Sequence, residues 1–467
     1  MKFRINNIGA IKKADIDIEG ITIIAGENNV GKSTVGKALY AFLHDMNLWE
    51  KTYDETCCFR IEKLLSQRSI RLDDWCMKVS GAKRRRTNRT NQLIKRYAKS
   101  DNFRGIIEDF QLADDEKSRY EARNSLNDDL KQYSHEYLSL YAKEKADDIW
   151  NHESEWVLEW IQDIIPMIQK IELDEVAIQT SQIQESLNTV FKGQYRRIGT
   201  NTSEMEFIDD TNRGVKFSLE ENNNILLDMP LRVTSRIFFI ESPKLYDYLS
   251  NNAYGTVQKE YLRYLMSPNI FKNNKNIFSV RLKEEPEIQE SSQRVSEITK
   301  RIEKVMGGRA EFLQKVGLEF KDDRLPESIH DINVSTGLKS LALLEYALRI
   351  EAIEEGDILI LDEPEINLHP EWQVEYAKTL VDLQKEFSLK IVITSHSPYF
   401  MRAIECFTDL SDTMNLLNVY RVTKENTGES KIENVSYSEY GITELYEDLS
   451  APLEKLDELL EKKYGED

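Results

Sequence analysis

Residues 21–34 read Ile21-Thr-Ile-Ile-Ala-Gly26-Glu-Asn-Asn-Val-Gly31-Lys32-Ser33-Thr34, and this stretch decides the fold, because an apolar strand-like run leads into a complete P-loop. Its glycines let the backbone curl so that successive N–H groups face an anion, and a helix predicted over residues 35–48 would add its positive N-terminal end. Lys32 would reach the β- and γ-phosphates of a nucleotide, and the Ser33 hydroxyl would bind Mg²⁺. The alternative is a glycine-rich turn that binds nothing.

Composition limits the classes of protein that remain. The chain has 467 residues, 40% of them hydrophobic, enough to bury more than one core. Its net charge of −20 argues against a protein that coats nucleic acid over its whole surface. No window approaches the roughly 18 apolar residues of a membrane span, the N-terminus lacks a signal-peptide pattern, and the four cysteines show no CxxC spacing. We therefore expect a cytoplasmic protein without membrane contact.

Alternation and spacing predict the order of the elements. Two short antiparallel strands should precede the P-loop strand, and residues 55–190, almost free of Gly and Pro, should be helical. Strand patterns return between residues 205 and 240. One amphipathic helix is expected over residues 286–306, where Gly307-Gly308 ends it.

A second apolar strand ends in two carboxylates. Residues 358–364 read Ile-Leu-Ile-Leu-Asp-Glu-Pro, and a strand that is apolar on both faces is typical of the centre of a parallel sheet covered by helices. Asp362 at the strand end would hold the water shell of Mg²⁺, and Glu363 would orient or deprotonate an attacking water. The alternative is a buried strand with a polar cap.

Two further motifs stand at the ends of predicted elements. A helix from near Pro370 would connect the carboxylate strand to the strand ending at Thr394-Ser-His396, which would place His396 near a γ-phosphate. Upstream, Ser335-Thr-Gly337-Leu-Lys339 begins a predicted helix, where the Ser335 hydroxyl and the following N–H groups could form an anion nest. Taken alone, a lone His is usually structural and the upstream motif means only a helix N-cap.

The order of these four motifs resembles that of an ABC-type ATPase head. Residues 361–370, Leu-Asp-Glu-Pro-Glu-Ile-Asn-Leu-His-Pro, followed by Ile-Thr-Ser-His-Ser-Pro at 393–398, are more specific. They resemble the soluble ABC-like members of the AAA ATPase domain class, in a branch near the SMC and OLD proteins that includes the ATPase subunits of Septu-type and PARIS-type anti-phage systems. The resemblance covers residues 1–45 and 230–450, approximately, and leaves the helical region 50–195 without a matching motif.

The resemblance implies a homodimer with composite sites, and higher oligomers are compatible with it. Ser335 and Gly337 of one protomer would close over the ATP of the other, and residues 365–368 would form a loop across that interface. The signature differs from the transporter sequence Leu-Ser-Gly-Gly-Gln, which argues against membrane transport, and no Q-loop glutamine stands out. The residues that we assign to ATP are Gly26, Asn28, Asn29, Gly31, Lys32, Ser33, Thr34, Ser335, Gly337 and Lys339. Those assigned to Mg²⁺ are Ser33 and Asp362, and those assigned to catalysis are Glu363 and His396.

The predicted fold class is α/β, an ABC-type P-loop ATPase head with a mixed or parallel sheet, an antiparallel β subdomain and helical insertions. The predicted segments are residues 1–48 for the N-terminal part of the head with the Walker A motif, 49–195 for a helical insertion, 196–249 for β strands of the head, 250–330 for a helical lobe and 331–467 for the C-terminal part of the head.

The resemblance favours a regulatory ATPase, the sensor or scaffold of an anti-phage defence complex, with the nuclease or toxin activity in a separate effector. The alternative is an SMC-like DNA-repair or DNA-structural ATPase that acts directly on DNA, although the insertions lack sustained heptads. A self-contained toxin has the least support. The six histidines are scattered, and a fused Toprim domain would need about 100 residues or more after the head.

One dense positive stretch stands out in this acidic chain. It consists of Lys83, Arg84, Arg85 and Arg86, followed by Arg89, Lys95 and Arg96. Such clusters commonly contact nucleic acid, so nucleic acid is a partner that the sequence allows. The stretch can equally form a solvated helix face, or pair with acidic residues 114–116, because few aromatic residues lie near for stacking.

Overall fold

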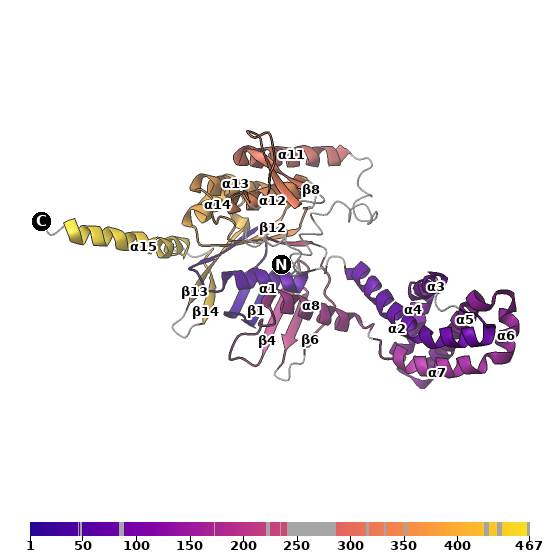
Figure 1. Cartoon of the computed structure of the whole chain (residues 1–467). Coiled ribbons are helices and arrows are strands. Elements are labelled where there is room, and N and C mark those ends of the chain that lie inside the picture. Colours follow the sequence, from indigo (N-terminus) through magenta and orange to yellow (C-terminus); the bar gives the residue numbers. More distant parts are fainter. Residues whose placement is uncertain are drawn as a thin grey trace. The chain divides into compact units, whose positions relative to one another are not determined.

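The computed structural model describes residues 1–44, 46, 49–83, 88–171, 173–220, 225–233, 235–240, 286–313, 317–330, 333–349, 353–424, 429–436 and 441–464. The chain divides into two compact units (Figure 1). One contains Met1–Asn47 and Gln179–Asp467, and we call it the sheet unit. The other, Leu48–Ile178, is built from helices, and we call it the helical unit.

The sheet unit contains a mixed sheet of 11 strands within the described residues, in the order β6-β5-β4-β1-β2-β14-β13-β3-β12-β11-β7. The strands are β1 (Lys2–Ile8), β2 (Ile11–Asp17), β3 (Ile21–Gly26), β4 (Ser203–Ile208), β5 (Gly214–Leu219), β6 (Ile225–Leu227), β7 (Ile237–Ile240), β11 (Ile358–Asp362), β12 (Lys390–Ser395), β13 (Leu417–Lys424) and β14 (Ser430–Asn434). Strands β7, β11, β12, β3 and β13 are parallel to one another, whereas β1, β2, β4, β5 and β6 pair antiparallel.

The parallel part of the sheet brings the predicted motifs to one edge. Strand β12 lies between β3 and β11, pairing Ile393 with Ile23 on one side and with Leu361 on the other. The strands are therefore in register, and their carboxyl ends meet at the same edge. Every residue of β3 and β11 is buried, as the run of apolar residues in each strand predicts.

Helices cover both faces of this parallel part. Successive strand residues point to opposite faces, so Leu359 and Leu361 share a core with residues of α11–α14, whereas Ile360 on the other face meets Gly36 of α1. The helices of the sheet unit are α1 (Lys32–Leu43), α11 (Pro286–Met306), α12 (Thr336–Arg349), α13 (Pro370–Phe387), α14 (Pro398–Leu410) and α15 (Gly441–Tyr464). Helix α8 (Glu175–Phe191) crosses the boundary between the units.

The helical unit has an aromatic core. Its helices are α2 (Trp49–Ser80), α3 (Asn88–Ala98), α4 (Asp101–Leu112), α5 (Glu116–Ala142), α6 (Ala146–Glu153) and α7 (Glu155–Ile168). The Tyr133 ring packs edge-on against Tyr97, with ring centroids 4.9 Å apart, and stacks on Trp160, with centroids 6.3 Å apart. The buried Asp73 carboxylate accepts hydrogen bonds from the hydroxyls of Tyr137 and Tyr141, which satisfies it inside this core. Across the parts of the chain that the structure describes, no helix has the length and apolarity to span a bilayer.

The predicted fold class is confirmed, with two differences in detail. Helix α1 spans Lys32–Leu43, whereas the sequence predicted a helix over residues 35–48. Residues 250–285 of the predicted helical lobe lie outside the described residues, and after α11 the chain forms a three-stranded antiparallel sheet of β8 (Gly308–Leu313), β9 (Gly317–Asp322) and β10 (Ile329–His330). The lobe is therefore not purely helical. Gly307-Gly308 ends the helix, and the strand that follows buries Ala310 in the core of α11 and α12.

Candidate functional site

The P-loop backbone is bent by two residues with positive φ. Strand β3 ends at Gly26 and α1 begins at Lys32, so the loop between them is only five residues long. Asn29 has φ 63° and Gly31, the residue before α1, has φ 93°, a region that glycine adopts at little cost. Asn28 and Asn29 are exposed, and Ser33 and Thr34 are half-buried in the first turn of α1. The loop therefore presents backbone N–H groups and the helix N-terminus together, the arrangement that binds phosphates.

Lys32 lies under this loop. Its side chain is 4% exposed, and its Nζ donates hydrogen bonds to the backbone oxygens of Gly26 at 2.9 Å and Glu27 at 2.7 Å. Glu363 Oε1 lies 3.7 Å from the same Nζ. Burial lowers the pKa of Lys32, and the nearby carboxylates of Glu363 and Glu365 oppose that shift. The ammonium is thus held in place by groups that phosphate oxygens could replace.

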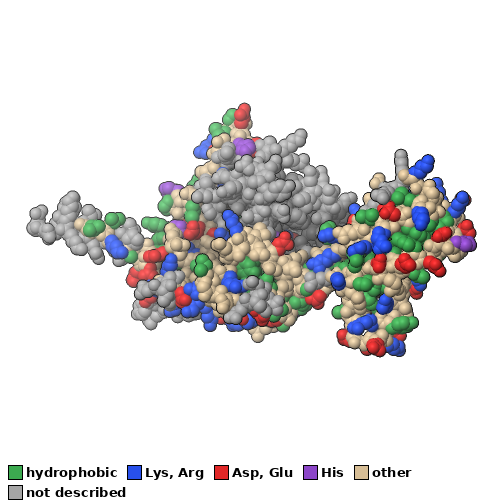
Figure 2. All heavy atoms as spheres, turned by 60° about the horizontal axis from the view of Figure 1, so that its bottom comes forward, with side chains coloured by type: hydrophobic (Ala, Val, Ile, Leu, Met, Phe, Trp, Pro, Cys, Tyr) green, Lys and Arg blue, Asp and Glu red, His purple; other side chains and the backbone are tan. Residues whose placement is uncertain are grey.

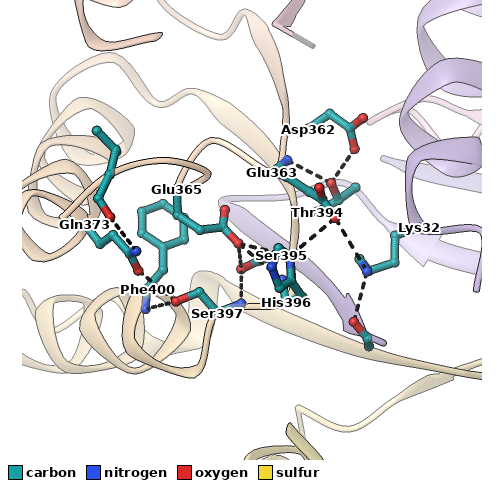
Figure 3. Close-up of polar contacts among 12 residues, drawn as sticks. Lys32, Asp362, Glu363, Glu365, Gln373, Thr394, Ser395, His396, Ser397 and Phe400 are labelled. Carbon is teal, nitrogen blue, oxygen red and sulfur yellow. Dashed lines mark hydrogen bonds and ion pairs between the residues drawn. The ribbon is translucent and has the colours of Figure 1, made fainter. Parts of the chain in front are cut away.

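The two acidic residues at the end of β11 are held by the neighbouring strand, Asp362 through its carboxylate and Glu363 through its backbone N–H. Thr394 on β12 donates from Oγ1 to Asp362 Oδ1 at 2.5 Å, and the Glu363 N–H donates to the Thr394 carbonyl at 3.0 Å (Figure 3). Glu363 has φ 49°, a left-handed conformation that costs a residue with a side chain about 1 kcal/mol or more. Such strain persists only where the surroundings hold it, and it is concentrated at functional sites.

His396 follows β12 and completes the cluster. Its Nδ1 lies 3.4 Å from Glu363 Oε1, an ion-pair distance rather than a hydrogen bond of good geometry. This contact raises the pKa of His396, and it lowers the pKa of Glu363 with help from Lys32. Lys32, Glu363 and His396 therefore converge at the carboxyl ends of three adjacent parallel strands, β3, β11 and β12.

A buried carboxylate beneath this cluster was not assigned a chemical role from the sequence. Glu365 is 2% exposed, and its Oε1 accepts from Ser395 Oγ at 2.5 Å and from the His396 N–H at 3.2 Å (Figure 3). Burial raises the pKa of Glu365. Its Oε2 and the hydroxyl of the fully buried Tyr376 have no hydrogen-bond partner within the described residues. The Glu365 side chain thus packs against the end of β12 within its own protomer, and the prediction that residues 365–368 form a loop across a dimer interface stays a prediction.

The upstream signature lies against the loop that follows the carboxylates. A Cβ on Gly337 would come within 2.6 Å of the Asn367 carbonyl oxygen, so only glycine fits at this position without a shift. Ser335 is exposed just before α12, whereas Lys339 is 2% exposed and is not presented to solvent. The structure therefore brings Lys32, Glu363 and His396 into one cluster and places Gly337 against Asn367.

The residues predicted to hold a metal fit Mg²⁺ bound together with phosphates. Within the described ranges, no three His, Cys, Asp or Glu side chains are grouped to hold a metal ion by themselves. Ser33 and Asp362 offer a hydroxyl and a carboxylate, which are hard oxygen donors. Mg²⁺ commonly uses one or two carboxylates and takes its other ligands from waters and substrate phosphates.

Comparison with known proteins gives one strong match and several weak ones. Residues 1–401 match the family model of the AAA ATPase domain. Protein ea59 of Escherichia phage lambda is 23% identical over 121 residues, which is 24% of this chain and 23% of that protein, so the chain matches less than a quarter of that relative's length.

Among solved structures, an SMC head bound to the C-winged helix domain of ScpA shares 12% identity with a TM-score of 0.42, covering 93% of this chain and 98% of that one. The SMC head domain from Thermotoga maritima shares 12% identity with a TM-score of 0.34 over the same shares of both chains. Structural similarity at this level identifies no function.

The family model covers most of the chain. Its matched range, residues 1–401, includes the P-loop at Lys32, the carboxylates at Asp362 and Glu363, and His396. These are the groups that the fold gathers at one edge of the parallel strands. The chain belongs to the AAA ATPase domain family.

Proposed function

We propose that this protein binds ATP with Mg²⁺ and hydrolyses it, as a regulatory ATPase of the cytoplasm. The observation that carries the proposal is the convergence of Lys32, Glu363 and His396, in which Glu363 Oε1 lies 3.7 Å from the lysine ammonium and 3.4 Å from the imidazole. A phosphate-binding loop, a cation and a carboxylate that can orient an attacking water, gathered at one sheet edge, are parts that phosphoryl transfer to water requires.

Each residue has a role that follows from its position. The N–H groups of residues 26–34 and the α1 N-terminus would bind phosphate oxygens. The Lys32 ammonium would give up its hydrogen bonds to the Gly26 and Glu27 carbonyls and donate to phosphate oxygens instead. Ser33 and Asp362 would hold Mg²⁺, which when bound neutralises charge on the phosphates. The lowered pKa of Glu363 keeps its carboxylate ionised near neutral pH, so it can accept a hydrogen bond or a proton from an attacking water. His396 would hold that carboxylate in position.

Composite sites in a homodimer are part of the proposal. Ser335 is exposed at the start of α12, and Asn367 beside Gly337 is exposed, although Gly337 itself is buried. A second protomer could therefore reach the signature at Ser335. One protomer would then supply Ser335 and Gly337 to the nucleotide held by the other, and higher oligomers would build on this pair. We also propose that the helical unit, Leu48–Ile178, is an insertion in the head, since the sheet unit continues on both sides of it in the sequence.

The biological role proposed is that of sensor or scaffold in an anti-phage defence complex whose nuclease or toxin is a separate protein. It rests on the resemblance of residues 361–370 and 393–398 to the Septu-type and PARIS-type subunits. Direct action on DNA, the second candidate, is favoured by the basic stretch that starts at Lys83. Co-purification with the product of the neighbouring gene, and mass measurement of the complex with and without ATP, separate the two.

The proposal of ATP binding is tested with Lys32→Ala. Loss of a charged hydrogen-bond donor should weaken ATP binding by about 1.5–3 kcal/mol, roughly 10- to 150-fold in Kd. The measurement is titration with a fluorescent ATP analogue in Mg²⁺, combined with phosphate release. Lys117→Ala, which changes an exposed lysine of the helical unit, is the matched control and should behave as the parent. Equal affinity of the Lys32→Ala variant and the parent would overturn the assignment.

A further inference from the structure

Charge is distributed unevenly in the helical unit. Residues 75–100 contain nine Lys and Arg and no Asp or Glu, in a chain whose net charge is −20. On the face of the molecule that Figure 2 shows, basic and acidic side chains otherwise lie side by side over the helical unit. Arg84, Arg85 and Arg86 lie outside the described residues, and the described part of this basic stretch is helix α3 with the residues beside it.

Helix α3 separates its residues into two faces. The buried face consists of Thr90, Leu93, Ile94, Tyr97 and Ala98. Tyr97 anchors it, with edge-on ring contacts to Tyr133 at 4.9 Å and to Phe103 at 5.7 Å. The exposed face, continued by one turn residue after the helix, consists of Asn88, Arg89, Asn91, Gln92, Lys95, Arg96 and Lys99. We call these seven residues the α3 basic face, and it carries four cations, three amides and no acid.

Most of this charge is not neutralised within the helical unit. Arg96 pairs with Glu136 of α5, and Glu136 also accepts from the Tyr97 hydroxyl at 3.1 Å. For Arg89, Lys95 and Lys99, no ion pair occurs among the residues that the structure describes. Lys83, exposed at the end of the described segment before α3, also forms no ion pair among the described residues. From Arg89 to Arg96 the helix rises about 10 Å, and Lys99 follows in the turn after it, so the cations form a row rather than a single point.

We propose that the α3 basic face binds the phosphate backbone of nucleic acid. Arg, Lys, Asn and Gln are the side chains that contact phosphates, sugars and base edges, and here they occupy the whole exposed face of one helix. An acidic protein partner fits less well, because stable protein interfaces depend on buried aromatic or large apolar anchors and this face has none. The proposal does not depend on ATP hydrolysis, since it uses only residues of the helical unit.

The test is fluorescence anisotropy with labelled duplex DNA, single-stranded DNA and single-stranded RNA of about 30 nucleotides, over salt concentrations from about 50 to 200 mM. Binding should weaken with salt, with a slope of log affinity of about −0.9 per phosphate contacted on duplex DNA. The whole protein carrying Arg89→Gln, Lys95→Gln and Lys99→Gln should show a slope flatter by about 2 to 3. The three probes distinguish duplex from single-stranded binding and DNA from RNA.

A matched control removes the same charge elsewhere. Lys117, Lys143 and Lys145 are exposed lysines at the start and just after the end of α5, so changing all three to Gln alters the net charge equally. This control should retain the parent's slope, and circular dichroism melts check that both triple variants fold. The proposal is overturned if the parent binds none of the probes at low salt, if both triple variants lose affinity equally, or if the α3 variant binds as the parent does. Displacement of the probe by polyglutamate as effectively as by unlabelled nucleic acid also overturns it, in favour of an acidic protein surface.

Discussion

At the residue scale, two glutamates that stand two positions apart have opposite environments. Glu363 is partly exposed beside His396 and Lys32, which lower its pKa, whereas Glu365 is 2% exposed and burial raises its pKa. Environments that separate the pKa values of neighbouring groups are a feature of catalytic sites. Glu363 is thus suited to remain ionised and face a reacting water, and Glu365 to hold the strand end that carries His396.

Glu365 can be tested as a positioning residue through two substitutions. Glu365→Gln keeps an oxygen that accepts from Ser395 and from the His396 N–H, so stability and turnover should stay near those of the parent. Glu365→Ala leaves these buried donors without an acceptor, which should cost about 1–3 kcal/mol and reduce turnover. Thermal melts and phosphate release measure both quantities. A Gln variant that is as stable as the parent but as inactive as the Ala variant would show that the carboxylate itself takes part in the reaction.

The pairing of His396 with Glu363 predicts a pH window for stability. The pKa of His396 is raised above 6.5, so its contribution to folding stability is complete below pH 6.5 and is lost as pH rises through the raised pKa. The pKa of Glu363 is lowered below 4.5, so its contribution to folding stability is complete above pH 4.5 and is lost as pH falls through the lowered pKa.

The difference in Tm between the parent and His396→Gln should therefore be largest between pH 4.5 and 6.5 and shrink on both sides. Melts with EDTA and without nucleotide measure it. The difference should be small and should decrease with salt, because the His396 side chain is 38% exposed. A difference that is constant with pH would contradict the ion pair.

The sequence predicted most residues of the cluster around Glu363 but not the position of Glu365. Lys32, Asp362, Glu363 and His396 each follow an apolar strand in a recognisable order, so parallel pairing brings them together without knowledge of the packing. The position of Glu365 depends on how the turn after Pro364 packs under β12, which no local pattern reports. A third acidic residue between the apolar residues Pro364 and Ile366 was the available signal.

At the element scale, the close packing of α1 on the sheet fixes the P-loop. Strand β12 between β3 and β11 sets the spacing of the P-loop and the carboxylates, and α1 lies on the face that Ile360 of β11 presents. The sequence predicted these strands because each is a continuous apolar run. It did not predict β8–β10, whose short strands carry charged residues among the apolar ones and depend on the surfaces of α11 and α12 for burial.

Two glycines within helices provide a matched comparison for this packing. A Cβ on Gly36 of α1 would lie 2.9 Å from Ile360 Cγ2, whereas a Cβ on Gly105 of α4 would meet nothing within 4 Å. Gly105→Ala should therefore stabilise the helical unit by about 0.5–1 kcal/mol, the helix-propensity gain. Gly36→Ala should destabilise the sheet unit, because the clash of the added Cβ with Ile360 outweighs the helix-propensity gain. Denaturant melts followed by circular dichroism test both, and stabilisation by Gly36→Ala would refute the close α1–β11 contact.

At the scale of the whole molecule, long-range pairing builds the sheet. Strand β1 pairs with β4, so Arg4 lies opposite Glu206 and their side chains form an ion pair, although the helical unit separates them in the sequence. Alternation predicted these strands but could not supply their partners, because antiparallel registers are set by packing and by turns. The same limit applies to assembly, since the sequence suggests a composite site only through its resemblance to ABC-type heads.

Complementation between two inactive variants tests that assembly. Ser335→Arg should abolish hydrolysis while leaving nucleotide binding to the P-loop largely intact. Mixed in equal amounts with Lys32→Ala protein, it should recover about a quarter of the parent rate, because half of the dimers are mixed and one of their two sites is intact. No recovery, with exchange of protomers verified by mass measurement, would show that each chain works alone.

The measurement that tests the central claim most directly is ATP binding and turnover by the Glu363→Gln variant. The amide keeps the shape of the side chain but cannot accept the proton, so ATP should bind with parental affinity while kcat falls by about 10²- to 10⁴-fold. Glu371→Gln, which changes an exposed glutamate in the first turn of α13, is the control and should turn over ATP as the parent does. Normal turnover by purified Glu363→Gln protein would contradict the assignment of this cluster as an ATPase site.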